Sequence, residues 1–88
     1  MQINPQYKVR NVVDENVVMV QGKNAGDMTT VVALNDTSLY LWNSLSGREF
    51  ELSDVVSLLT DKYDVEHDRA TADAESWIDT MRQNNLII

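Results

Sequence analysis

The sequence contains no cysteine, and this absence removes several kinds of chemistry at once. Disulfide bridges, thiolate nucleophiles and cysteine-ligated metal sites all require that residue. No apolar run approaches the roughly 20 residues of a membrane span, and the first residues lack the basic and hydrophobic regions of a signal peptide. We therefore expect a soluble, cytoplasmic protein with no membrane partner.

Motifs for catalysis and metal binding are also missing. His67 is the only histidine, and no second histidine lies at a metal-binding spacing from it. The sequence has no Gly-rich phosphate loop, no Gly-x-Ser-x-Gly motif and no cluster of Lys and Arg interleaved with aromatic residues. The acidic residues fall on the polar faces of predicted helices, where solvation explains them. We expect no enzyme activity, no metal and no other cofactor.

Positive charge is scarce in the second part of the chain. Residues 1–34 carry three basic and three acidic side chains, whereas residues 35–88 carry four basic and eleven acidic ones, a net charge of −7. A surface that binds a phosphate backbone is basic, because phosphate contacts supply most of the non-specific affinity. This distribution argues against a nucleic-acid partner.

The chain has 88 residues, which is enough for a single domain over residues 1–88 with a small core. Its central feature is a change of hydrophobic period from two to 3.6 residues between residues 34 and 47. Asn35 is a suitable helix N-cap, and Leu39, Trp42 and Leu45 follow at helical spacing on one face. Gly47 suits the left-handed position after the helix. We predict a helix over residues 36–46, with Trp42 in the core.

Residues before this helix have strand patterns. Apolar alternation predicts strands over residues 7–13, 17–20 and 29–34, with a polar turn at residues 14–16. Residues 17–20 are so apolar that we expect that strand to be buried on both faces. The sequence therefore predicts a three-stranded antiparallel sheet.

Two more helices follow, over residues 53–62 and 67–84. Ser53 is the expected N-cap of the first, and the Asn84-Asn85 pair is the expected stop of the second. The last three residues, 86–88, are apolar and should pack back onto the domain. The predicted fold class is α+β, an N-terminal sheet followed by three helices.

A three-stranded sheet has two edges, and an uncovered edge presents unpaired N–H and C=O groups. An extended peptide can add there as a further strand, with nearby side-chain pockets supplying selectivity. The alternative is an edge that is only twisted or capped, and composition alone favours this alternative.

A set of residues occurs in a characteristic order through most of the chain: Leu34-Asn35, Trp42, Leu45, Gly47, Leu52-Ser53, Val55-Val56, Tyr63-Asp64-Val65, Asp73-Ala74, Trp77-Ile78, Met81 and Leu86-Ile87. Their joint order and spacing resemble the PqqD family of small peptide chaperones, over residues 7–88. The sequence departs from the family pattern at Asn84-Asn85, where a glycine is usual, and at Glu66-His67, where Asp-Pro is common.

This resemblance implies a winged-helix-like domain that acts as a recognition element for ribosomally made and post-translationally modified peptides (RiPPs). In the family, the leader of a precursor peptide pairs with the third strand and lies in the groove between that strand and the third helix. The domain then presents the peptide to a modifying enzyme. In pyrroloquinoline quinone (PQQ) biosynthesis this is a radical S-adenosylmethionine (SAM) enzyme, and related pathways use the same or another peptide-modifying enzyme.

Carried onto this chain, the resemblance implies a non-catalytic peptide adaptor with these candidate peptide-binding residues: Thr29, Thr30, Val31, Val32, Ala33, Asp73, Ala74, Trp77 and Met81. The protein would be a monomer, or a dimer formed by edge pairing or swapping. A winged-helix DNA-binding domain and a purely structural interaction domain are the alternatives. The acidic third predicted helix argues against DNA binding.

Overall fold

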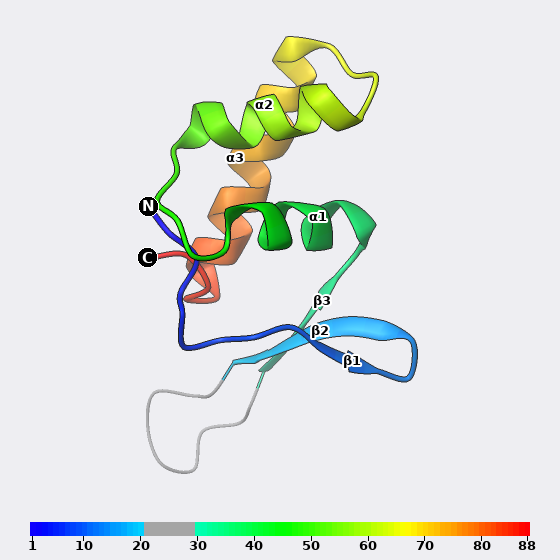
Figure 1. Ribbon diagram of the computed structural model, residues 1–88, viewed down its shortest axis with the longest axis vertical. Coiled ribbons are helices and arrows are strands. Elements are labelled where there is room, and N and C mark those ends of the chain that lie inside the picture. Colours follow the sequence, from blue (N-terminus) through cyan, green and yellow to red (C-terminus); the bar gives the residue numbers. More distant parts are fainter. Residues whose placement is uncertain (21–29) are drawn as a thin grey trace.

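The computed structural model describes residues 1–20 and 30–88, and it confirms the predicted α+β class. The described part of the chain forms an antiparallel sheet of order β1-β2-β3, followed by three helices. Figure 1 shows the sheet at one end of the molecule and the helices at the other. No helix in the described residues is long and apolar enough to cross a membrane. The elements are β1 (Arg10–Val12), β2 (Glu15–Val20), β3 (Thr30–Leu34), α1 (Asp36–Leu45), α2 (Leu52–Lys62) and α3 (His67–Gln83).

The first hairpin differs from the prediction, because β1 is shorter than residues 7–13. Val12 pairs with Glu15, and the two residues between them, Val13 and Asp14, have φ angles of 50° and 65°. Positive φ at both central positions is typical of a type I′ turn, whose twist matches that of the flanking strands. The turn therefore begins at Val13, and Glu15 and Asn16 belong to β2 rather than to the predicted turn.

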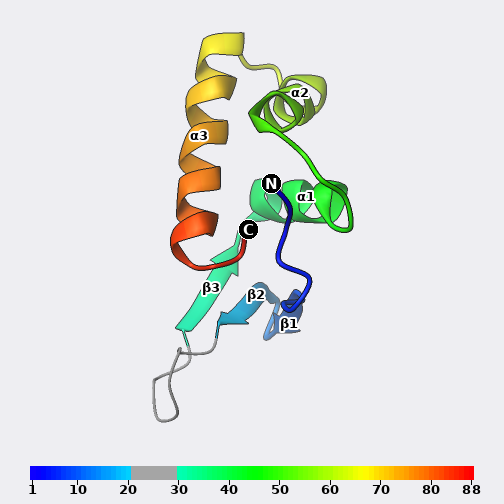
Figure 2. The same cartoon turned by 90° about the vertical axis from the view of Figure 1, so that its left-hand side faces the viewer.

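The expectation that β2 is buried on both faces is wrong at Met19. Val17 and Val18 are buried, but Met19 is 43% exposed and its cross-strand partner Val31 is 56% exposed. The two views show the helices on one side of the sheet only (Figures 1 and 2). Met19 and Val31 are paired across the two strands, so their side chains share one face, and that face is open to solvent at this position.

Helix α1 is capped as predicted, whereas the cap of α2 differs. The side-chain oxygen of Asn35 accepts a hydrogen bond from the Ser38 N–H at 2.9 Å, and Gly47 has the left-handed φ of 82°. Helix α2 begins one residue earlier than predicted, with Glu51 rather than Ser53 as its N-cap. The Asp54 carboxylate accepts a hydrogen bond from the Glu51 N–H at 2.8 Å. Asp54, three residues after the cap, therefore supplies the reciprocal contact of a capping box.

Helix α3 ends where the asparagine pair predicted. Asn84 is the C-cap, and Asn85 has a φ of 65°, a conformation that asparagine tolerates. The chain then turns, and Leu86 and Ile87 are buried in the core as expected. Trp42 of α1 is also buried there, which confirms its predicted role as a core residue.

A second, small ladder joins the first and last residues, and the sequence patterns did not predict it. Gln2 and Ile88 exchange backbone hydrogen bonds of 2.8 and 2.9 Å, and the Phe50 N–H donates to the Met1 carbonyl at 2.8 Å. Residues 1–4 therefore lie between residues 49–50 and residues 86–88. Because these segments are far apart in sequence, only tertiary packing brings them together.

Candidate functional site

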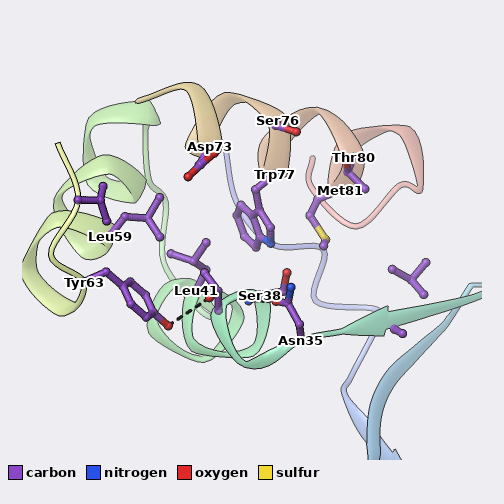
Figure 3. Close-up of a pocket in the computed structure, with 14 residues that line it drawn as sticks. Asn35, Ser38, Leu41, Leu59, Tyr63, Asp73, Ser76, Trp77, Thr80 and Met81 are labelled. Atoms are coloured by element: carbon purple, nitrogen blue, oxygen red, sulfur yellow. Dashed lines mark hydrogen bonds between the residues drawn. The ribbon is translucent and has the colours of Figure 1, made fainter. Parts of the chain in front are cut away.

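A groove of about 440 Å³ opens between β3 and α3 (Figure 3). Residues of α1 and of the end of α2 complete its walls. The lining is mixed, with apolar side chains alongside hydroxyls, one amide and one carboxylate. The lining residues are Val32, Ala33, Asn35, Thr37, Ser38, Leu41, Leu59, Tyr63, Val65, Asp73, Ser76, Trp77, Thr80 and Met81.

Strand β3 lies at the edge of the sheet, and within the described residues it pairs on one side only, with β2. The first hairpin determines which way its backbone groups point. The residues that flank a two-residue turn exchange ladder hydrogen bonds, and bonding direction alternates along an antiparallel strand. Glu15 flanks that turn and bonds to β1. The next residue and every second one after it, Asn16, Val18 and Val20, therefore bond to β3.

These β2 residues are registered with Leu34, Val32 and Thr30 of β3. The intervening β3 residues, Val31 and Ala33, consequently direct their N–H and C=O groups away from the sheet. This open edge runs beside the groove, because Ala33 and its neighbour Val32 both line it. An extended peptide that paired with Val31 and Ala33 would bring its side chains next to the groove.

The groove face of α3 combines polar residues with one large aromatic ring. Asp73, Ser76, Trp77 and Thr80 follow at helical spacing and all line the groove. Trp77 is 9% exposed. Its Nε1 is a buried side-chain nitrogen with no hydrogen-bond partner among the described residues. A buried donor without an acceptor costs about 1–3 kcal/mol, and such groups are rare in native proteins.

Tyr63 forms the wall of the groove opposite α3. The Thr37 hydroxyl donates a hydrogen bond to the Tyr63 hydroxyl at 3.2 Å, the dashed contact in Figure 3. The Tyr63 ring also packs edge to face against Tyr40, with 6.3 Å between ring centroids. Aromatic pairs prefer this geometry, which fixes the ring orientation. The wall is therefore held in place by contacts from α1.

Asp73 is the only charged residue among the described residues that line the groove. Its carboxylate lies 3.9 Å from the Arg69 guanidinium in an exposed pair, a kind that contributes little to stability. The lining presents no cation that would bind a phosphate, and no three potential metal ligands of the His, Cys, Asp or Glu type come together in the described residues. The arrangement suits a neutral, partly apolar ligand that can also accept hydrogen bonds.

The structure places the predicted site residues in different environments. Five of them, Val32, Ala33, Asp73, Trp77 and Met81, line the groove. Thr30 and Val31 lie in β3 beside it, and Thr29 falls outside the described residues. Ala74 is fully buried in the core cluster and is not one of the lining residues.

Sequence reasoning missed several lining residues. Ser76 and Thr80 could have been found, since they follow Asp73 at three and seven residues and share its face of α3. The contributions of α1 and α2, among them Thr37, Leu59 and Tyr63, had no such signal. They depend on how the three helices pack around β3.

Comparison with known protein families adds one finding. A family model described as coenzyme PQQ synthesis protein D (PqqD) matches residues 15–87. The matched region runs from β2 to the residues after α3, so it includes both walls of the groove. No curated protein and no solved structure matched the chain.

Proposed function

Because the chain belongs to the PqqD family, whose members are generally non-catalytic chaperones, we propose that it binds the leader of a ribosomally made precursor peptide. It then presents the peptide to a modifying enzyme, a radical SAM enzyme or another peptide-modifying enzyme. The family match is consistent with an accessory protein of PQQ biosynthesis or of a related RiPP pathway. The protein supplies the binding site, and the partner enzyme supplies the chemistry.

The observation that carries this proposal is the open edge of β3 beside the groove. Val31 and Ala33 offer two N–H and two C=O groups to an added strand, and these groups would satisfy the main chain of an extended peptide. Side chains alternate along a strand, so every second residue of the peptide would face the groove. The backbone contacts then provide affinity, and the groove provides selectivity.

DNA binding receives less support from the surface of α3. The exposed acidic residues of this helix outnumber its two arginines, Arg69 and Arg82. A recognition helix approaches phosphates closely, so these carboxylates would repel the duplex. The exposed acidic residues of α3 are Asp68, Asp73, Glu75 and Asp79.

Isotope-labelled protein titrated with a leader peptide tests the proposal. The peptide is the N-terminal part of a short precursor encoded by a neighbouring reading frame, and a scrambled peptide of the same composition is the control. We expect the amide resonances of Val31 and Ala33 and the indole resonance of Trp77 to shift with the leader only. Binding that leaves residues 30–34 and α3 unmoved would contradict this site.

The leader peptide also allows a test of the oligomeric state, because an open strand edge can also pair with a second copy of the chain. If the protein forms such a dimer, the leader and the second copy compete for one edge. Sedimentation with and without the leader should then show the dimer dissociating as the peptide binds.

A further inference from the structure

Trp77 carries a hydrogen-bond donor that no described residue accepts. The indole ring extends from α3 towards Asn35 and Ser38 at the start of α1, within the groove (Figure 3). Its Nε1 is buried and has no acceptor among the described residues. Indole nitrogen only donates, so it needs a group with a free lone pair. A ligand in the groove is a natural source of that group.

We infer that Trp77 makes the groove selective for a peptide side chain that combines an apolar stem with an uncharged hydrogen-bond acceptor. Tyrosine and glutamine have this character, whereas leucine and phenylalanine fill space without satisfying the donor. The inference rests on the proposed function, since it assigns a preference to the same peptide site. It goes further by naming the residue that sets the preference and the chemistry that it selects.

The charges of the groove explain why the acceptor is uncharged. Among the described residues, no Lys, Arg or His lines the groove, and Asp73 adds a negative charge to its lining. A peptide carboxylate placed beside Trp77 would be buried without a cation and close to another carboxylate, which is unfavourable. A peptide lysine or arginine cannot accept a hydrogen bond from the indole. A hydroxyl or a side-chain amide can accept that hydrogen bond, because its oxygen has a free lone pair.

Access to Nε1 requires a movement of the groove lining, because this atom is buried. Met81 follows Trp77 by one helical turn on the same face of α3 and lines the groove beside it. Methionine is unbranched and adapts its shape at little cost. Rotation of the Met81 side chain is the movement that would let an acceptor reach the indole.

Three small probes test the chemistry without knowledge of the peptide: p-cresol, toluene and 4-methylbenzoate. All three contain a methyl-substituted benzene ring. p-Cresol adds a neutral acceptor, toluene adds no acceptor, and 4-methylbenzoate adds a carboxylate. The readout is the indole N–H resonance of Trp77, assigned in labelled wild-type protein through NOE contacts to its own backbone and checked by its absence in Trp77→Phe. The indole resonance of Trp42, in the core, is the internal control.

We expect p-cresol to move the Trp77 resonance downfield and to bind about three- to tenfold more tightly than toluene, the range of one neutral hydrogen bond. 4-Methylbenzoate should bind most weakly. The Trp77→Phe protein keeps an aromatic ring and should lose the preference for p-cresol. Equal affinity for p-cresol and toluene, tighter binding of the carboxylate, or no response to any probe would each overturn the inference. The comparison in the wild-type protein is decisive even if Trp77→Phe fails to fold.

A displayed library of random peptides, selected in parallel on wild-type and Trp77→Phe protein, separates this inference from the proposed function. Enrichment of tyrosine or glutamine at one position on the wild type, and its loss on the variant, supports both. Binders with the same composition on both proteins contradict the selectivity and leave peptide binding intact. A library that yields no binder contradicts the proposed function itself, and with it the assignment of the groove to a peptide side chain.

Discussion

Helix α3 contributes to two neighbouring regions, the core that it forms with α1 and α2 and the groove that it forms with β3. In the core, Ala70, Ala74 and Ile78 are buried among apolar neighbours, and the described residues place no polar or charged residue there. In the groove, the Trp77 donor and the backbone groups of Val31 at the edge have no partner among the described residues. Core side chains satisfy one another, whereas the groove has polar groups that the described residues leave unpaired.

The small ladder of residues 1–4 and the sheet of β1, β2 and β3 also differ in whether their backbone groups are paired within the chain. Residues 1–4 fill the space between residues 49–50 and 86–88, and their backbone groups are paired on both sides. The described residues place no such segment beside β3, so its outer groups remain available. Both ladders use the same hydrogen-bonding chemistry. They differ in whether the chain itself supplies the neighbouring strand.

The largest expected effect lies in the core, at Trp42. Replacing Trp42 with alanine removes a large buried side chain and should lower the free energy of unfolding by about 3–5 kcal/mol. In a domain this small, that loss is enough to unfold much of the protein. Asn43→Ala, at the exposed next position of α1, is the matched control. A Trp42→Ala protein that melts within a few degrees of the parent would contradict the core assignment.

Two tryptophan substitutions, one on the core face of α3 and one on its groove face, give the next largest expected effect. Ala74 is 0% exposed, so Ala74→Trp overpacks the core and should destabilise the domain by about 1–3 kcal/mol or more. Ser76 is exposed at the groove, so Ser76→Trp should keep the melting temperature and obstruct the ligand. Urea denaturation and probe titration measure the two effects. If Ser76→Trp unfolds the protein while Ala74→Trp is tolerated, the two faces have been assigned the wrong way round.

Proline at adjacent positions of β3 tests which backbone groups face outward. Val32→Pro removes a ladder hydrogen bond to Val18 and should cost stability, about 1–3 kcal/mol if the acceptor is left unpaired. Val31→Pro removes an N–H that points to the open edge, so the fold should survive while peptide affinity falls. Circular dichroism and titration with the leader peptide separate the outcomes. The reverse result would shift the hydrogen-bonding register of β3 by one residue.

The last prediction is that the protein does not bind duplex DNA. Because Asp73 lies in the groove and α3 carries more acidic than basic side chains, we expect no binding at physiological salt. Fluorescence anisotropy over a salt series measures this. Micromolar affinity with a steep salt dependence would favour the winged-helix DNA-binding alternative over a peptide groove.

Local patterns predicted most of the elements because each depends on neighbouring residues. Asn35 caps α1 and Asn85 adopts the left-handed conformation, as their side chains indicate. Errors occurred where two local signals competed. Ser53 was predicted as the N-cap of α2, but Glu51 is the N-cap, and its N–H donates a hydrogen bond to the Asp54 carboxylate. At the hairpin, Val13 suits a strand by its side chain, yet the two-residue turn places it outside β1.

The sequence by itself determined the order of the elements, the N-cap of α1, the end of α3 and the acidic character of the helical part, because these follow from local residues and composition. It also indicated the apolar stripe of α3. Only the tertiary structure decided that Ala74 faces the core while Ser76 faces the groove, and that residues 1–4 close one ladder while β3 keeps an open edge. Helical spacing shows which residues share a face, but the neighbour that covers each face is set by packing between distant segments.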